Sequence, residues 1–215
     1  MNLGELRDQF VELSGRYDLV NEDGTDNGAD FFISRGQAYL DRRFEAGAGT
    51  QLKDITLSAG DWTKTTSNLR RAEELWVQND DGVWVPLRRV SFNQLAWWFP
   101  KLNQTEKGFP TTFTSRTPYG AKEPKLYILP PPEVSRDAKL SGVFKAAALS
   151  SATDTNFWSD LYPDILIMAA QREIEVFHRN SQGIQDWEQV IQLEMKAIEE
   201  DYVASQTYHI NQMEG

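Results

Sequence analysis

The sequence predicts an α+β fold: helices from both ends of the chain form one four-helix bundle-like domain, an antiparallel β domain is inserted between them, and an extended C-terminal tail follows. Apolar residues recur at helical spacing near both ends, aromatic and β-branched runs separated by turn residues fill the middle, and the net charge changes at the same places. We expect the helical domain to comprise residues 1–49 and 158–205, the β domain residues 50–157, and the tail residues 206–215.

Two helices are predicted at the N-terminal end. Four apolar residues at spacings of three and four define one stripe of the first helix, which Gly15 ends: Leu3, Leu6, Phe10 and Leu13. The stretch 21–28 is dense in turn-forming residues and predicts a loop. A second helix follows, capped by Asp30 or a neighbour and ended by Gly47 and Gly49.

The middle of the chain has the pattern of short antiparallel strands in a small sheet or sandwich. The predicted strands are 51–57, 75–78, 83–87, 111–114, 125–129 and 138–145. The second and third flank the turn Asn79–Gly82, whose Asp-Gly pair supplies the positive φ of a hairpin. Trp76 and Trp84 fit cross-strand pairing here, so we interpret them as structural residues of the sheet. A short helix or loop is expected between Phe92 and Phe99.

Two further helices are predicted at the C-terminal end. From Leu161 to Phe177 the apolar residues form one broad face. After a turn at 180–183, a second helix carries an apolar stripe at spacings of three and four: Trp187, Ile191, Met195, Ile198 and Tyr202. Residues 204–215 have no such periodicity, which predicts a tail.

The charge distribution restricts the function. The chain carries 22 Lys and Arg against 32 Asp and Glu, a net charge of −10, divided into −5 for residues 1–49, +3 for 50–157 and −8 for 158–215. This balance argues against a protein whose main activity is to grip nucleic-acid phosphates, because such binding needs Lys and Arg. No apolar run is long enough to cross a membrane, and the N-terminus lacks the features of a signal peptide, so we expect neither.

Metal and catalytic sites are not indicated either. The chain has no Cys and two His, which excludes disulfides, Cys-ligated metals and a three-His site. The stretch 23–34 matches an EF-hand loop at its first positions but ends in Ser34 where Glu is required, which favours an interhelical loop. Adjacent carboxylates at 73–74 and 80–81 are interpreted as solvated, and His178 as complementing a helix dipole. We expect no enzymatic activity, no cofactor and no metal.

Three stretches occur in an order that is informative as a whole. The first, 30–42, combines small residues with Tyr-Leu-Asp. The second, 75–132, has a strand, the hairpin, the Gly-x-Pro of Gly108–Pro110 and a tyrosine strand ending in three prolines. The third, 154–170, is followed by an acidic helix. Together they resemble the head-to-tail adaptor (connector) proteins of tailed bacteriophages, including the tail tubular protein A type of short-tailed phages and the gatekeeper-like adaptors. The loop 21–30 and the pair Trp97–Trp98 depart from this pattern.

The resemblance implies a structural protein of the virion. It implies a homo-oligomeric ring, twelve-fold in this family, that binds the portal protein, extends the DNA channel and provides the attachment platform for a downstream tail protein. Genome DNA passes through without specific binding, and no membrane is involved. The expected location is the neck between capsid and tail, with assembly in the host cytoplasm.

The resemblance also implies two sets of site residues. The helical part forms the ring wall, and an acidic lumen repels DNA phosphates and favours sliding. We therefore expect the channel to be lined by Glu194, Glu199, Glu200 and Asp201. A C-terminal extension commonly reaches toward the portal, so we expect contacts from Tyr208, His209, Ile210 and Met213. A frayed chain end is the alternative interpretation of this tail.

A second function class stays open at this point. The Trp-rich middle of the chain is also compatible with a carbohydrate- or receptor-binding tail module in which Trp76, Trp84, Trp97 or Trp98 offers a stacking platform.

Overall fold

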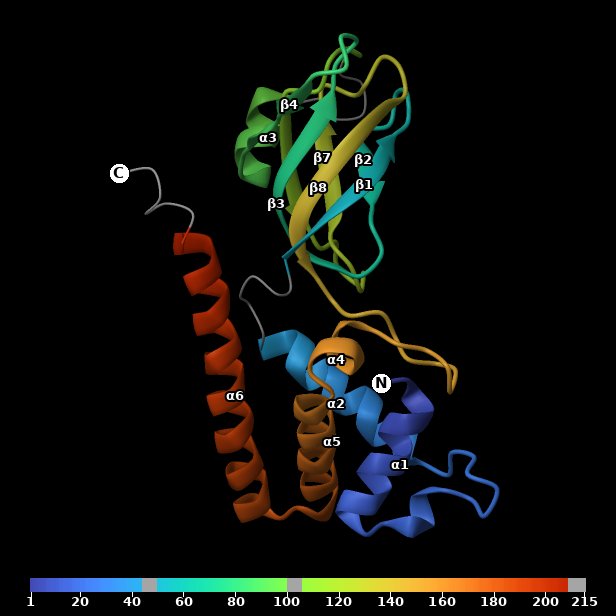
Figure 1. The fold of residues 1–215 in the computed structure, drawn as a ribbon. Helices are drawn as coiled ribbons and strands as arrows, with labels where there is room; N and C mark the ends of the chain where they lie inside the picture. The colour runs from blue at the N-terminus through green and yellow to red at the C-terminus, as the bar shows by residue number, and fades with distance from the viewer. Residues whose placement is uncertain (44–49, 100–105, 209–215) are drawn as a thin grey trace. The chain divides into compact units, whose positions relative to one another are not determined.

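The computed structural model describes residues 1–43, 50–99 and 106–208; for residue 50 and residues 201–208 it describes the backbone alone. The predicted mixture of α and β structure is confirmed (Figure 1). The chain divides into two compact units, a helical unit of Met1–Ala48 with Ala146–Gly215 and a β unit of Gly49–Lys145. Among the described residues, no helix combines the length and apolar character needed to cross a bilayer.

The helical unit contains helices from both ends of the chain. They are α1 (Leu3–Ser14), the 3₁₀ turn η1 (Tyr17–Leu19), α2 (Ala29–Arg43), α4 (Phe157–Leu161), α5 (Pro163–His178) and α6 (Ser181–Tyr208). Asn2 and Glu5 form a capping box at the start of α1, and Gly15 ends this helix in the left-handed conformation with φ of 65°. The four longer helices lie where the apolar periodicity predicts them, whereas the short α4 was not predicted.

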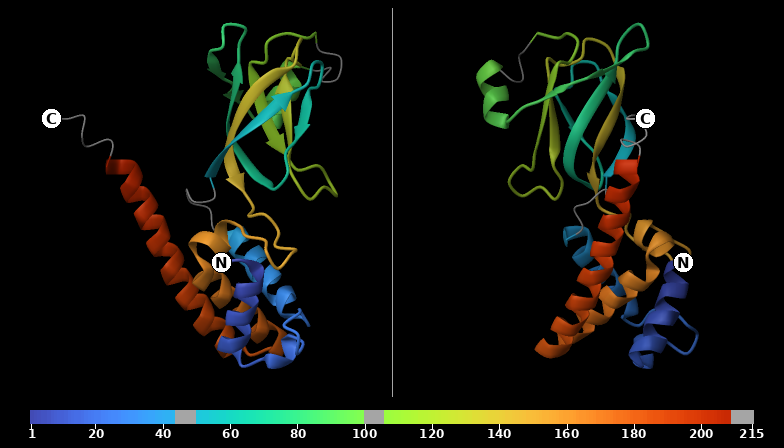
Figure 2. Two further views of the ribbon diagram at one scale, coloured as in Figure 1. Left: turned by 45° about the vertical axis from the view of Figure 1, so that its right-hand side comes forward. Right: turned by 60° about the vertical axis from the view of Figure 1, so that its left-hand side comes forward.

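Helix α5 is the centre of this unit, because α1, α2, α4 and α6 all pack against it. The four-helix bundle expected from the sequence is not what the structure describes: α6 packs mainly on α5, which lies beside it in both views of Figure 2. The physical reason is that α5 is apolar on several faces, with Ile165, Leu166, Ile167, Ala169 and Ala170 all buried. A helix that is apolar around most of its circumference occupies the interior of a fold.

Residues 146–156 group with the helices, whereas the sequence placed them in the β domain. Polar contacts explain the difference. The amide nitrogen of Asn156 donates to Oε1 of Gln37 at 3.0 Å and to the carbonyl of Ala147 at 2.7 Å. The backbone N–H of Ala146 donates to Oδ1 of Asp41 at 3.2 Å. The bonds to Gln37 and Asp41 tie the segment to α2.

The β unit is a sandwich of two four-stranded sheets. One sheet has the order β1 (Thr50–Leu57), β8 (Arg136–Phe144), β3 (Leu69–Gln78) and β4 (Trp84–Pro86), and the other has β2 (Thr63–Thr65), β7 (Lys125–Leu129), β6 (Thr112–Arg116) and β5 (Arg88–Arg89). All strand pairs are antiparallel except β5 with β6. Buried side chains of both sheets, such as Leu140 and Phe113, share one core. Helix α3 (Phe92–Trp98) follows β5.

The predicted hairpin is confirmed. Val77 pairs with Val85 across β3 and β4, and Gly82 in the turn has φ of +79°. Asn79 organises the turn, since its side chain accepts the backbone N–H groups of Asp81 at 3.0 Å and Val83 at 2.8 Å. This Asx-type contact fixes the turn locally.

Candidate functional site

The acidic residues predicted to line a channel lie on α6, but the helix does not bring them to one face. Glu194 and Glu200 are exposed, Glu199 is half-buried, and Nζ of Lys196 lies 3.5 Å from Oε1 of Glu200. At about 100° per residue, Glu199 lies roughly 140° and Glu200 roughly 120° around the helix from Glu194. Only position 201, two turns after Glu194, shares its side of the helix backbone.

The predicted portal-binding residues lie at the end of the described chain. Residues 206–208 continue α6, so the expected tail begins later than residue 206. The reason is that residues 203–208 contain no Gly or Pro to stop the helix. The backbone of Tyr208 is thus helical rather than extended, while His209, Ile210 and Met213 lie outside the described residues.

A cluster of charged side chains connects the N-terminal part of α6 to the rest of the helical unit. Arg172 of α5 donates to Oε1 of Glu188 from Nε at 3.0 Å and from Nη2 at 2.6 Å. Arg43 of α2 reaches the same oxygen at 3.5 Å. Burial by itself would lower the pKa of Arg172, but the hydrogen bonds to Glu188 and the charges of Tyr39, Glu188 and Glu173 together outweigh it and raise that pKa. The buried Ile191 and Met195 complete the contact with α5.

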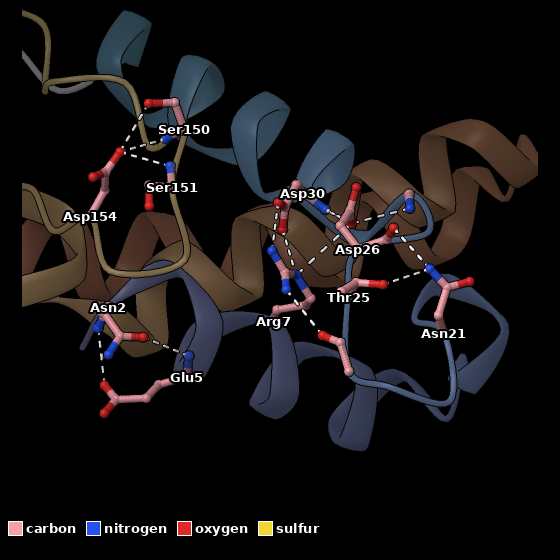
Figure 3. A network of polar contacts seen from close by, with 12 residues as sticks. Asn2, Glu5, Arg7, Asn21, Thr25, Asp26, Asp30, Ser150, Ser151 and Asp154 are labelled. Atoms are coloured by element: carbon pink, nitrogen blue, oxygen red, sulfur yellow. Dashed lines mark hydrogen bonds and ion pairs between the residues drawn. The ribbon is translucent and has the colours of Figure 1, made fainter.

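A second polar cluster organises the loop between α1 and α2 (Figure 3). Arg7 donates to both carboxylate oxygens of Asp30, at 2.9 and 2.8 Å, and to the carbonyl of Gly24 at 3.2 Å. Its hydrogen bond to Asp30 raises the pKa of Arg7 despite burial. Asp30 is therefore an ion-pair partner, and the backbone N–H groups at the start of α2 are instead accepted by Asp26, at 3.1 and 2.9 Å. This corrects the predicted cap.

The same contacts explain the loop that partly resembles a calcium site. Asp23 accepts hydrogen bonds from the hydroxyl and the backbone N–H of Thr25, at 2.6 and 3.0 Å, so this carboxylate stabilises the turn itself. Across the described ranges, no three His, Asp or Glu side chains are grouped so that they would hold a metal ion.

Trp76 and Trp84 lie in paired strands as expected, but on the outer face of the sheet and not in its core. Leu75 and Val77 are buried, so Trp76 between them lies on the opposite face, where 36 % of it is exposed. Trp84 is half-buried beneath Nζ of Lys139, which lies 4.9 Å from its ring centre. Trp97 is 79 % exposed on α3. Their sequence pattern was not decisive, because the same aromatic residues are used in sheet cores and on binding surfaces.

Trp76 and Trp84 form a groove. Its volume is about 480 Å³, and its lining also includes Pro86, two carboxylates (Glu73 and Glu74) and Arg89. Trp76 and Trp84 sit diagonally across the strand pair, because Trp76 is opposite Pro86 and Trp84 opposite Gln78. The groove therefore combines flat apolar surfaces with hydrogen-bond acceptors and a guanidinium donor.

Comparisons with known proteins add no relative to this description. The sequence matches no protein-family model and no curated protein.

Proposed function

We propose that this chain is a structural head-to-tail adaptor of a tailed bacteriophage. In this proposal, copies form a ring, twelve-fold by the family resemblance, that binds the portal protein, continues the DNA channel and carries a downstream tail protein. The proposed location is the neck of the virion, and the protein turns over no substrate.

The observation that carries the proposal is the way the chain is divided. Helices from both ends share one hydrophobic core, in which Phe10 of α1, Ile33 of α2 and Leu166 of α5 are all buried. The intervening residues form a separate sandwich with its own core. This division agrees with the α–β–α order of the stretches on which the family resemblance rests.

Acidic residues of α6 support the channel part of the proposal. A helix of 28 residues is about 42 Å long, and Glu194 and Glu200 are both exposed on it, roughly 120° apart around its axis. We propose that these two residues, with Glu199 and Asp201, give the channel a negative wall. Such a wall repels DNA phosphates and keeps DNA from adhering during passage.

Native mass measurement of the purified chain, alone and mixed with the portal protein of the same phage, tests the main proposal. We expect a defined ring that associates with the portal. A chain lacking residues 209–215 should keep the melting temperature of the full chain but bind the portal more weakly. A strict monomer that never joins the portal would contradict the adaptor function, and unchanged binding by the shortened chain would remove the tail from it.

The channel residues are tested by reversing their charge. Replacing Glu194, Glu199 and Glu200 by Lys should create a ring that retains linear DNA in a filter assay, and added salt should release it. Replacing Asp54, Asp81 and Glu133 of the β unit by Lys changes the net charge equally and serves as the control. Equal retention by both triple variants would show that α6 does not line the channel.

A carbohydrate-binding function is the second candidate, and the exposed tryptophan groove favours it. The rings of Trp76 and Trp84 offer stacking surfaces for the apolar faces of sugar rings, while Glu74 and Arg89 offer hydrogen-bond partners for hydroxyl groups. Binding to an array of bacterial surface glycans, lost in Trp76→Ala and kept in Trp97→Ala, is the expected result. Absence of binding to every glycan on the array would contradict this candidate.

A further inference from the structure

The helical unit leaves two separate apolar surfaces uncovered. The first is a groove of about 280 Å³ between α1, α5 and α6, lined by Leu13, Ile167, Met168 and Trp187 together with Asp164. Leu13 belongs to the apolar stripe of α1, yet 70 % of it is exposed. The apolar stripe of α1 therefore extends beyond the part of the helix that is buried in the core, and Leu13 at its end lines the groove.

The second surface is a pair of phenylalanines, Phe31 of α2 and Phe177 of α5, which are 54 % and 67 % exposed. Both rings make edge-to-face contacts with the buried Phe32, with ring centres 5.3 and 6.0 Å apart. Phe32 therefore holds both rings in place, which lowers the entropy lost when they bind a partner. The guanidinium of Arg35 lies 5.5 Å from the ring centre of Phe31.

The two surfaces lie on different sides of the unit. Phe177 follows Met168 by nine residues of α5, which is about two and a half helical turns, so their side chains leave the helix on opposite sides. When the phenylalanine pair of one copy contacts the groove of another copy, the groove of the first copy and the phenylalanine pair of the second therefore stay available. Such a head-to-tail contact repeats, and it closes into a ring when the rotation between copies permits.

The chemistry of the two surfaces is complementary. The phenylalanine pair presents flat apolar rings beside a cation, and the groove presents an apolar floor with one carboxylate, Asp164. Arg35 also pairs with Glu173 at 3.0 Å, but half of its side chain is exposed and able to face a second carboxylate. Burial of two phenylalanine rings supplies the apolar area, while the charge pair selects the orientation.

We propose that Phe31 and Phe177 of one copy dock into the groove formed by Leu13, Ile167, Met168 and Trp187 of a second copy. This inference rests on the proposed function in taking the ring as the assembly. The contact itself requires neither the portal nor DNA. It assigns the surfaces through which the copies meet.

The absence of Cys from the sequence allows a direct test. Ser34→Cys places a thiol one helical turn from Phe31, and Val190→Cys places one a turn from Trp187; both positions are exposed, and both changes preserve size. We expect oxidation with copper phenanthroline to produce disulfide-linked dimers only when the two variants are mixed. Cross-links within either variant alone would indicate a symmetric contact and overturn the proposal. So would the absence of cross-links in the mixture.

Charge substitutions provide an independent test. Phe31→Glu with Phe177→Glu should abolish assembly in native mass measurement, whereas Leu52→Glu, at an equally exposed apolar position of the β unit, should leave it unchanged. Circular dichroism melting checks that the variants fold. Portal binding is measured separately. A ring that binds the portal without the cross-link contradicts this contact alone, and cross-links without portal binding contradict the adaptor function alone.

Discussion

The helical unit and the β sandwich are stabilised by contacts of different reach along the chain. In the helical unit, polar side chains join segments more than a hundred residues apart: Nε1 of Trp158 donates to Asp41 at 2.8 Å, and Nε2 of Gln171 donates to the carbonyl of Phe10 at 3.1 Å. The sandwich is made from one continuous stretch, Gly49–Lys145. One unit therefore depends on both ends of the chain, whereas the core of the other is built from a single continuous stretch.

The largest expected effect is the loss of Trp158. This side chain is buried, and it joins the C-terminal segment to α2 through Asp41. Trp158→Ala should destabilise the helical unit by about 3–5 kcal/mol, because it leaves a cavity and removes the indole N–H that Asp41 accepts. Calorimetry should show this unit melting earlier while the sandwich transition stays in place. Equal loss in both transitions would mean that the units unfold together.

Two glycines provide a matched pair of changes, one in each unit. A Cβ on Gly36 would lie 2.7 Å from the backbone nitrogen of Ala170, where α2 crosses α5, and a Cβ on Gly142 would approach the carbonyl oxygen of Arg71, where β8 meets the irregular strand β3. Each change to Ala should cost about 1–3 kcal/mol through overpacking against backbone. Gly36→Ala should lower only the helical transition and Gly142→Ala only the sandwich transition; the opposite assignment would refute the comparison.

A smaller effect is expected at the hairpin turn. Because Gly82 has φ of +79°, a β-branched side chain there is strained. Gly82→Val should destabilise the sandwich by about 1 kcal/mol or more. Gly120, with φ of +77° in a loop, offers a comparison for the same substitution. A sandwich melting temperature that Gly82→Val leaves unchanged would show that the turn adapts.

The smallest effect is a pH dependence in the helical unit. Backbone hydrogen bonds from Ser150 and Ser151 lower the pKa of Asp154 below its ordinary 3.8. A lowered pKa in the folded state stabilises the fold above the ordinary pKa, and this contribution is lost as the pH falls through the folded value. Asp154→Asn should flatten the fall in helical-unit stability below about pH 4. An identical pH profile in the variant would contradict this assignment.

Much of the fold could be predicted from the sequence, because the patterns that specify helices and turns are local. Leu3, Leu6 and Phe10 are buried as their spacing predicts, and the turn at Gly82 follows from its residue types. The pairing of β1 with β8 and of β3 with β8 was not predictable, since it joins segments far apart in sequence. Periodicity identifies an apolar stripe but not the partner that covers it, which is why the exposure of Leu13 and Phe177 emerged only from the structure.

The candidate surfaces were less predictable than the fold. Acidic residues of α6 were proposed from the family resemblance and the uneven charge of the chain, but their distribution around the helix requires knowing which side packs on α5. Trp76 lies in a strand as predicted, and only the burial of Leu75 and Val77 on either side shows that it faces outward. The groove beside Trp187 arises from three helices together, so no single stretch of sequence carries its signal.

The division of the helical unit between the two chain ends has a consequence during synthesis. About 120 residues separate the end of α2 from the start of α5, the helix on which both N-terminal helices pack. At roughly 5–20 residues per second, the ribosome needs about 6–24 s to supply that partner. The sandwich is fully translated within this interval, so the order of translation makes it the first unit able to fold. The surfaces of α1 and α2 that pack on α5 have no partner until that helix is synthesised.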